Sequence, residues 1–587
     1  MSENTYILGL SFDYHNSAAA LLRGGEIVAA CEEERFTRKK NDSSYPQNAV
    51  DACLRIAGIG PERLGAVVFY EDPLRKMNRI LETYVADNPN RPYGTAALAT
   101  WLSRGKLLPA LKVRRHLGIA PDKIHFCQHH EAHAASAFFA SPFQEAAILT
   151  IDGIGEYETM AVYSGRGSRI EKLYSVRFPH SIGLLYSAFT AFLGFEVNEG
   201  EYKVMGMAAF GEPSFSDTVR TLIRYNPDGT FQLDTRYFDF TSGRDLPVTE
   251  LFLELFGTPR RPEEPFSVSG PGAERCKRYA DLAASIQLVA EEAISRLAMA
   301  ALEKTGAANL CMAGGVALNS SANGKLQRAL KGRIYIQPAA GDSGGALGAA
   351  MWHAFGILGI GRTGFQRSAY LGLEYGKSEA AEAIKKAGYE VYKEFAREDD
   401  MVDCVAGLLA KENAIGWAQG RFEWGPRALG CRSILADPRR KRMQEFVNMK
   451  IKYREPFRPF APACLAEEAH RYFDLPEGLD VLPLQDFMLA VVPVNDYGRR
   501  MLEAVTHVDN SARPQFVRSQ TNPLFHKLIS RFFELTGVAV LLNTSFNLRG
   551  EPIVATPYDA IRTFTWSHLD YLAVGPFLLR RGDVICL

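Results

Sequence analysis

A pattern of three short strands occurs twice in the chain, and it limits the folds that the chain can adopt. The first copy covers residues 6–31, where three apolar runs are separated by a polar turn and by Gly24-Gly25. The second covers residues 147–176, where the runs are separated by residues 152–156 and 165–167. Glycine and polar residues between apolar runs indicate strands joined by turns. The repeat predicts two similar α/β lobes that face a cleft, with two unrelated meanders in one α/β protein as the alternative.

Two histidines four residues apart stand in a segment that favours a helix. His129 and His133 are followed by small residues at 134–137, and side chains four apart lie on one face of a helix. Both imidazoles can therefore reach one metal ion. A zinc protease of the His-Glu-x-x-His type is excluded, because Glu131 stands two residues after the first histidine. The alternative is a helix with ordinary surface or core histidines.

Length and charge exclude several classes of protein. A chain of 587 residues with 47% apolar content can bury large cores and should divide into two to four domains. Lys+Arg and Asp+Glu both number 67, which argues against a general nucleic-acid or anionic-membrane binder. The nine cysteines include no C-x-x-C pair, so neither a disulfide framework nor a cysteine zinc site is expected. Without a secretory leader or an apolar run of ~18 residues, we expect a soluble cytoplasmic protein.

Two later strands end in glycine-rich turns. The run 309–313 is followed by Gly314-Gly315-Val316-Ala317-Leu318-Asn319, where glycines let a flat ring or a phosphate approach the backbone. The run 334–337 leads to Asp342 before a helix whose first turn has free N–H groups, which suits a phosphate or a metal-bridged phosphate. Gly-Asp-Ser-Gly-Gly also surrounds the nucleophile of trypsin-like proteases, but those are all-β, and the helix-forming residues 346–353 argue against that class.

The segments between these strands give weaker signals. Residues 201–211 are glycine-rich and irregular, so a plain helix is not expected there, and residues 212–278 read as an insertion. An apolar stripe from Leu282 to Leu297 predicts a long amphipathic helix that Gly306 closes.

The chain changes character from about residue 365 and then carries a local excess of positive charge. Between residues 421 and 458, eleven lysines and arginines stand against four acids. The planar fork of arginine matches phosphate oxygens two at a time, so this segment favours a compact phosphorylated substrate. The arginines that suit this chemistry are Arg427, Arg432, Arg454 and Arg458. No G-x-x-x-x-G-K-[ST] motif occurs, so a nucleotide would not be held by a P-loop.

A last buried strand, residues 538–542, is followed by Asn543-Thr-Ser-Phe-Asn547 and then Arg549. Neutral hydrogen bonds from Asn543 and Asn547 could orient a carbonyl or an amide group. Both asparagines could equally be turn residues, and the pattern leaves the two interpretations open.

Nine motifs, in order from about residue 6 to 575, resemble the NodU/CmcH family of O-carbamoyltransferases. They are His15 in its turn and the segments 32–38, 129–133, 152–156, 201–206, 314–319, 424–430, 454–462 and 543–547. The resemblance implies an α/β protein with an N-terminal actin-like domain (ASKHA, ribonuclease H-like and duplicated) over residues 1–364. It also implies a C-terminal YrdC-like α/β domain over residues 365–587.

The resemblance further implies a metal site and two substrate sites. A divalent ion, expected to be Fe²⁺, would be held by His129, His133, Asp152 and Asp342, with His15 assisting the acceptor hydroxyl. The residues expected to hold carbamoyl phosphate are Arg427, Arg432, Lys450, Lys452, Arg454, Arg458, Arg513, Asn543, Asn547 and Arg549. The residues expected near a nucleotide are Lys40, Lys203, Gly314, Gly315, Val316 and Asn319.

The implied reaction converts carbamoyl phosphate and ATP to carbamoyladenylate and passes the carbamoyl group to a hydroxyl of a small-molecule natural product, as in antibiotic biosynthesis. We expect this hydroxylated acceptor as the partner, with no nucleic acid and no membrane, and leave a homodimer open. An actin-like small-molecule kinase is one alternative, but it gives the basic segment no role. A tRNA-modifying enzyme is another, but it should show a broad basic face, which the neutral charge does not favour.

Overall fold

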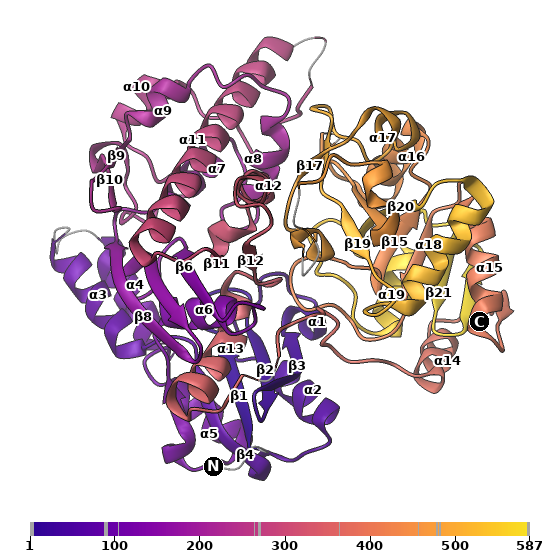
Figure 1. The fold of residues 1–587 in the computed structure, drawn as a ribbon, viewed down its shortest axis with the longest axis horizontal. Coiled ribbons are helices and arrows are strands. Elements are labelled where there is room, and N and C mark those ends of the chain that lie inside the picture. Colours follow the sequence, from indigo (N-terminus) through magenta and orange to yellow (C-terminus); the bar gives the residue numbers. More distant parts are fainter. Residues whose placement is uncertain are drawn as a thin grey trace. The chain divides into compact units, whose positions relative to one another are not determined.

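The chain divides into two units, which a computed structural model describes at residues 5–86, 92–103, 105–262, 264–267, 270, 272–362, 364–455, 457–476, 479 and 483–583 (Figure 1). Unit 1 consists of Met1–Val28, Ser43–Gln47 and Ala57–Gln366, and unit 2 of Ala29–Asp42, Asn48–Ile56 and Arg367–Leu587. The main boundary lies close to the predicted one after residue 364. The sequence did not predict that two early segments, residues 29–42 and 48–56, belong to the second unit.

Two five-stranded sheets are built from the first part of the chain. The first contains β1 (Tyr6–Ser11), β2 (Ala18–Arg23), β3 (Glu26–Glu32), β4 (Leu64–Phe69) and β5 (Ile124–Phe126), in the order β3-β2-β1-β4-β5. The second contains β6 (Glu145–Ile151), β7 (Glu158–Arg166), β8 (Arg169–Arg177), β11 (Leu310–Ala313) and β12 (Ile334–Ile336), in the order β12-β11-β6-β7-β8.

The two sheets share one topology. In the first, β1 pairs antiparallel with β2 and parallel with β4, which pairs parallel with β5. In the second, β6 pairs antiparallel with β7 and parallel with β11, which pairs parallel with β12. The predicted duplication of the strand unit is therefore confirmed, and the mixed α/β class with it.

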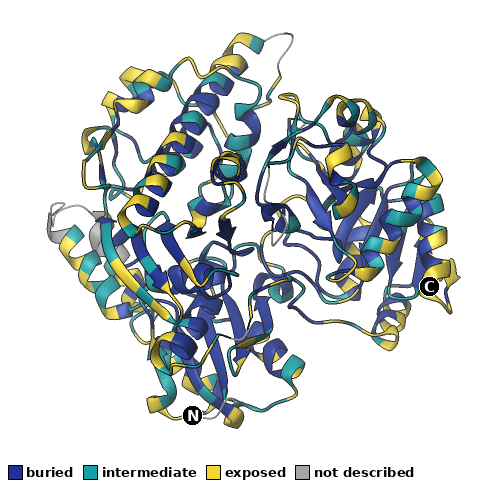
Figure 2. Ribbon diagram, viewed as in Figure 1, coloured by how far each residue is buried: buried dark blue, intermediate teal, exposed yellow. Residues whose placement is uncertain are grey.

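The helices of this part of the chain include long and very short ones. They are α1 (Glu34–Thr37), α2 (Gln47–Ala57), α3 (Pro73–Ala86), α4 (Pro92–Ser103), α5 (Pro109–Leu117), α6 (His129–Phe138), α7 (Ile182–Phe192), α8 (Glu201–Ala208), α9 (Ser216–Arg220), α10 (Glu250–Phe256), α11 (Ala273–Thr305), α12 (Ser320–Ala329) and α13 (Asp342–Met351). The strands of the two sheets and one face of α11 are buried (Figure 2). No helix among the described residues is both long enough and apolar enough to cross a membrane.

Small residues let α13 approach its neighbours closely. A Cβ added at Gly348 would lie 1.8 Å from the carbonyl oxygen of Ala132 in α6. A Cβ at Gly9 of β1 would lie 1.8 Å from the carbonyl oxygen of Ala346 in α13. Glycine is required at both positions because any side chain would push the elements apart. The N-terminus of α13, which carries Asp342, is thereby held beside the histidine helix.

The expectation that residues 201–211 would not form a plain helix is wrong, because α8 covers Glu201–Ala208. Val204 and Met207 are fully buried, and α8 packs on α11. Burial of these side chains outweighs the ~1 kcal/mol that a helical glycine such as Gly206 costs. The following insertion, whose pattern was uninformative, contains α9, α10 and the hairpin of β9 (Ile223–Tyr225) and β10 (Phe231–Leu233).

Unit 2 is built on an eight-stranded sheet. Its strands are β13 (Lys393–Glu394), β14 (Ile415–Ala418), β15 (Arg432–Ala436), β16 (Ala461–Leu465), β19 (Gln515–Val517), β20 (Val540–Ser545), β21 (Tyr571–Val574) and β22 (Phe577–Arg580), in the order β13-β22-β21-β14-β15-β20-β16-β19. A separate two-stranded sheet pairs β17 (Val492–Pro493) with β18 (Ser511–Ala512). The α-helices of unit 2 after residue 366 are α14 (Lys377–Lys386), α15 (Glu398–Leu409), α16 (Lys441–Phe446), α17 (Asp496–Met501), α18 (Pro523–Thr536) and α19 (Pro557–Thr565).

The register of the large sheet separates its two faces. Ala418 of β14 stands opposite Arg432 of β15 and opposite Val574 of β21, so these three residues share one face. Ser433 of β15 stands opposite Ser545 of β20. Because successive residues of a strand point to opposite faces, Ser433 and Ser545 lie on the other face.

A buried histidine should make unit 1 less stable in acid. His353 has no hydrogen-bond partner on either ring nitrogen among the described residues, and its ring stacks on His125 with centroids 4.4 Å apart. Burial, with a smaller contribution from His125, lowers the pKa of His353 from 6.5 to about 4. Between these two values the unfolded chain binds more protons than the folded one, so stability falls as the pH decreases through this window.

His353→Phe should therefore reduce the loss of unfolding free energy between about pH 7.5 and pH 5.5. Urea unfolding at both pH values measures this loss. The control is His470→Phe, since His470 is exposed. An equal loss in the wild type and in His353→Phe would contradict the prediction.

Candidate metal centre and anion site

Four side chains of unit 1 converge on one point. His129 and His133 project from α6, Asp152 follows β6, and Asp342 is the first residue of α13. One ligand atom from each of the four lies within 4.8 Å of the others. The predicted set of metal ligands is thus brought together, although its members are separated by up to about two hundred residues of sequence.

The atoms that meet are those that would bind a cation. The Nε2 atoms of His129 and His133 are 3.1 Å apart, and Asp152 Oδ2 lies 3.3 Å from the first and 2.9 Å from the second. Asp342 Oδ1 lies 3.8 Å from Nε2 of His129 and 3.7 Å from Nε2 of His133. Two imidazole nitrogens and two carboxylates suit a divalent transition metal, and the donor set does not select iron among these ions.

Charge within the cluster shifts the protonation of its members. Burial opposes a charge on His133, but hydrogen bonds to Asp152 and Asp342 outweigh it and raise the pKa of His133 to about 9. Burial likewise opposes ionisation of Asp152, but hydrogen bonds from both histidines hold the pKa of Asp152 well below its usual value. The carboxylates therefore stay charged, as ligands of a cation must.

Two neighbouring residues that were not selected from the sequence, Glu156 and Tyr70, form hydrogen bonds that hold this cluster in place. Glu156 accepts hydrogen bonds from the backbone N–H of His129 at 2.9 Å and of Asp72 at 2.8 Å, and so caps the N-terminus of α6. The hydroxyl of Tyr70 donates to Asp342 Oδ2 at 3.3 Å. Glu156 closes the predicted motif 152–156, so its spacing was visible in the sequence, whereas nothing marked Tyr70.

His15 lies at the edge of the cluster. Its Nε2 is 3.7 Å from Asp342 Oδ2, its Nδ1 is 2.7 Å from Asn16 Oδ1, and its side chain is 22% exposed. The turn that carries it is held by Lys112, which bonds both carboxylate oxygens of Asp13 at 2.6 and 2.8 Å. A partly exposed imidazole beside a buried cluster can exchange a proton with a bound molecule.

The predicted nucleotide residues fall into both units. Lys203 lies on α8 and residues 314–319 follow β11 in unit 1, whereas Lys40 belongs to unit 2. Gly314 has φ +97°, and a Cβ there would lie 2.1 Å from the carbonyl oxygen of Ile151, so the backbone itself requires this glycine. Asn319 caps α12 by accepting from the N–H of Ala322. Nucleotide binding by these residues stays a prediction.

Cationic side chains gather around Arg513 in unit 2. Burial lowers the pKa of Arg513 well below its ordinary value, and the charges of Arg427, Arg454 and Arg458 lower it further. Its Nε is buried and has no hydrogen-bond partner among the described residues. Buried like charges repel one another, so the cluster is suited to an anion that would compensate them.

Lys452 belongs to the same cluster. Burial lowers its pKa well below the ordinary value, and Arg454, Arg458 and Lys40 lower it further. Its Nζ donates to Ser545 O at 2.8 Å and to Asn547 O and Oδ1 at 2.9 and 2.5 Å. We call Lys40, Arg427, Lys452, Arg454, Arg458 and Arg513 the cation cluster.

The other predicted anion ligands take different positions. Arg432 and Ser433 point to opposite faces of the large sheet, and Lys450 and Arg549 are exposed.

The asparagines near the cation cluster bond to different partners. Asn547 accepts from Lys452. Asn543 donates to Ala428 O at 3.2 Å, and its own Oδ1 is buried without a partner among the described residues. Asn448, which the sequence analysis did not select, accepts from Arg454 Nε at 2.7 Å. The assignment of Arg432, Lys450 and Arg549 to an anion stays a prediction.

Glu423 organises the loop that carries Arg427. One carboxylate oxygen of Glu423 accepts from the backbone N–H of Leu429 and Cys431, both at 2.8 Å, and of Arg432 at 3.0 Å. Three charge-assisted bonds to one loop fix its backbone strongly. No sequence signal marked this acid, because it appeared only as one charge among many.

Family models match both parts of the chain. One described as Carbamoyltransferase N-terminus matches residues 6–351, and one described as Carbamoyltransferase C-terminus matches residues 406–581.

Some similar proteins match nearly the whole of this chain, and others match less than half of it. The uncharacterized protein sll1178 of Synechocystis sp. is 44% identical over 98% of this chain and 97% of its own length. The nodulation protein NolNO of Sinorhizobium fredii is 36% identical over 99% of this chain and 81% of its own. A 3'-hydroxymethylcephem-O-carbamoyltransferase of Amycolatopsis lactamdurans is 34% identical over 43% of this chain and 44% of its own.

Proposed function

Because the chain belongs to the carbamoyltransferase family, as its motifs predict, we propose that it is an ATP-dependent O-carbamoyltransferase that uses carbamoyl phosphate and a hydroxylated small molecule. The observation that carries the proposal is the presence of two different sites in one chain. Unit 1 holds two imidazoles and two carboxylates around one point, and unit 2 holds a cluster of six cationic side chains that includes the buried Arg513.

The cation cluster suits the activation of carbamoyl phosphate. Phosphate carries two negative charges, and arginine and lysine beside it lower the energy of the phosphate as it leaves. Water and carbamoyl phosphate give carbamate and phosphate, and the carbamate oxygen attacks the α-phosphorus of ATP, giving carbamoyladenylate and pyrophosphate. We assign this step to unit 2, because the cation cluster belongs to it. The same proposed role in adenylate formation is why we propose that unit 2 is YrdC-like.

The cluster of unit 1 suits the transfer step. A divalent cation held by His129, His133, Asp152 and Asp342 would supply charge stabilisation at a carbonyl or phosphate oxygen, and we expect Fe²⁺. His15 would accept the proton of the acceptor hydroxyl as its oxygen attacks the carbamoyl carbon, and AMP would leave. The product is a carbamate ester, and the acceptor is a hydroxylated natural product.

Purified protein incubated with carbamoyl phosphate, ATP and a panel of hydroxylated natural products tests the proposal. We expect one acceptor to gain the mass of a carbamoyl group in place of one hydrogen, with one AMP and one pyrophosphate formed for each product. A phosphorylated product would identify a kinase instead. If bulk tRNA is modified and no small molecule is, the assignment of the acceptor is wrong.

Glu423→Gln should raise KM for carbamoyl phosphate about fivefold to tenfold with kcat nearly unchanged, because a neutral acceptor holds the loop of Arg427 less firmly. Initial rates of pyrophosphate release measure both constants. Glu445→Gln is the matched control, since Glu445 is exposed on α16. Equal KM values for Glu423→Gln and the control would exclude this positioning role.

A further inference from the structure

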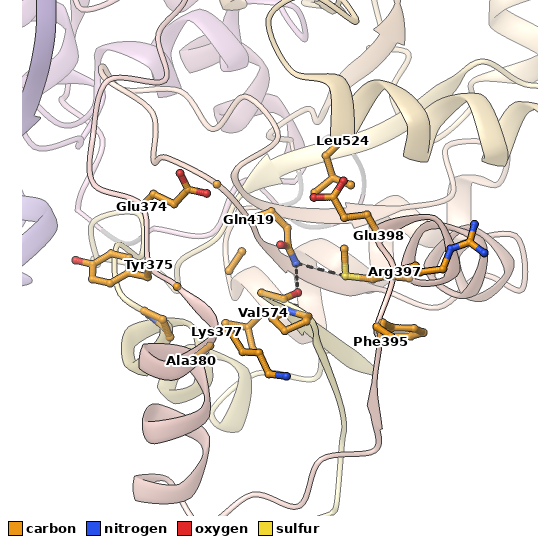
Figure 3. Close-up of a pocket in the computed structure, with 18 of the residues that line it drawn as sticks. Glu374, Tyr375, Lys377, Ala380, Phe395, Arg397, Glu398, Gln419, Leu524 and Val574 are labelled. Atoms are coloured by element: carbon orange, nitrogen blue, oxygen red, sulfur yellow. Dashed lines mark hydrogen bonds between the residues drawn. The ribbon is translucent and has the colours of Figure 1, made fainter. Parts of the chain in front are cut away.

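A cavity of unit 2 is lined by residues outside the cation cluster. It has a volume of about 280 Å³ and lies where the parallel strands β14 and β21 end and where α14 and α15 begin (Figure 3). In Figure 3, Gln419 and Val574 lie between Lys377 and Ala380 of α14 on one side and Phe395 and Arg397 on the other. We call this cavity the α14–α15 pocket. A volume near 300 Å³ is enough for a small metabolite.

The sheet register shows that this pocket is distinct from the cation cluster. Ala418, Arg432 and Val574 line the pocket and share one face of the sheet. Lys452, a member of the cation cluster, donates to the side-chain Oγ of Ser545 at 3.2 Å, and Ser545 stands opposite Ser433 on the other face. A ligand in the pocket would therefore not occupy the cation cluster.

Arg432 presents an unused donor to the pocket. It is only 3% exposed, its Nε donates to Ala555 O at 3.0 Å, and its Nη1 donates to Gln419 O at 3.0 Å and Gly420 O at 3.1 Å. These bonds fix the guanidinium in place. Its Nη2 has no hydrogen-bond partner in the described part of the chain. A fixed arginine with free N–H donors in a mostly buried position is suited to a carboxylate.

The remaining lining includes the acids Glu374 and Glu398, the cations Lys377 and Arg397, and an apolar wall. Glu374 lines the pocket, is exposed, and is close enough to Arg432 for its charge to act on that guanidinium. Phe395, Met401 and Leu524 supply apolar surface. A fixed cation, a nearby acid and an apolar wall match the carboxylate, the ammonium and the side chain of an α-amino acid.

We propose that the α14–α15 pocket binds a free α-amino acid with an apolar side chain. Its carboxylate meets Nη2 of Arg432, its ammonium meets Glu374, and its side chain lies against Phe395 and Met401. This proposal does not depend on the reaction proposed for the protein.

Calorimetric titration of the full-length protein with L-valine, L-leucine, L-isoleucine, L-methionine and L-phenylalanine tests it. At least one of them should bind. The amide of the amino acid that binds lacks the carboxylate, and the corresponding deaminated acid lacks the ammonium. Each of these two analogues should therefore bind at least about tenfold more weakly than the amino acid. Binding of the deaminated acid as tight as that of the amino acid, or no binding by any of the five, would overturn the proposal.

Variants and competition place the ligand in this pocket. Glu374→Gln should weaken binding about tenfold, whereas Glu382→Gln on the nearby α14 should not, because Glu382 is exposed and does not line the pocket. Carbamoyl phosphate should leave the affinity unchanged. If carbamoyl phosphate displaces the amino acid, or if the two variants bind equally, the ligand lies elsewhere and the assignment of the pocket is wrong.

Discussion

His129→Ala should lower the rate of carbamoyl transfer on the order of 1,000-fold while carbamoyl phosphate and ATP still give pyrophosphate. The substitution removes one of four ligand side chains whose reactive atoms lie within 4.8 Å of one another. Loss of a cation from such a site removes several kcal/mol of charge stabilisation in the transfer step, and each ~1.4 kcal/mol is a factor of ten in rate. The cation cluster belongs to unit 2, so the activation step has no reason to change.

Two measurements on the same sample check this prediction. Elemental analysis of the purified variant gives the bound metal, and product formation is followed beside pyrophosphate release. Asp342→Asn, which keeps the shape of the side chain, should have the same effect if alanine disturbs folding. His125→Ala is the control, because His125 lies on β5 and belongs to no cluster of metal ligands among the residues that the structure describes. Full transfer and unchanged metal content in His129→Ala would show that these histidines hold no functional ion.

Helical spacing alone paired His129 and His133 as metal ligands, whereas the resemblance to the family added Asp152 and Asp342 to the set. His129 and His133 have helical spacing, Asp152 follows a strand, and Asp342 precedes a helix of small residues. Such positions set the direction of a side chain through local geometry alone. Tyr70 has no such mark, since it reaches Asp342 only because β4 lies beside β1 in the folded sheet.

The anion site was predicted only in part, because charge count does not show which way a side chain points. Arg427 and Arg432 are five residues apart in one basic segment. The first belongs to the cation cluster, whereas the second lies on the opposite sheet face from Ser433 and Ser545. That difference depends on the register of β15 against β20, which involves residues more than a hundred positions apart. Residues 29–42, which include Lys40, belong to unit 2 although most of that unit begins at Arg367. Their place in unit 2 therefore also depends on contacts between residues far apart in the sequence.

Arg513→Ala should raise KM for carbamoyl phosphate about 10- to 100-fold and leave transfer from preformed carbamoyladenylate unchanged. Hydrogen bonds from a buried charged donor contribute about 1.5–3 kcal/mol, which corresponds to this range. The Nε of Arg513 is buried without a partner among the described residues, and neighbouring cations lower the pKa of the guanidinium. A bound phosphate would relieve this repulsion, so the side chain should contribute to binding more than to the stability of the free protein.

Thermal unfolding with and without carbamoyl phosphate is a second, independent readout. Because Arg513 is destabilised by Arg427, Arg454 and Arg458 in the absence of an anion, Arg513→Ala should unfold at the same or a higher temperature than the wild type without ligand. Addition of carbamoyl phosphate should stabilise the wild type much more than the variant, since the stabilisation, RT ln(1 + [L]/Kd), becomes smaller as the dissociation constant Kd increases. Arg499→Ala, on exposed α17, should behave as the wild type in both respects. A wild-type KM in Arg513→Ala, with equal stabilisation by carbamoyl phosphate, would remove the cation cluster from the reaction.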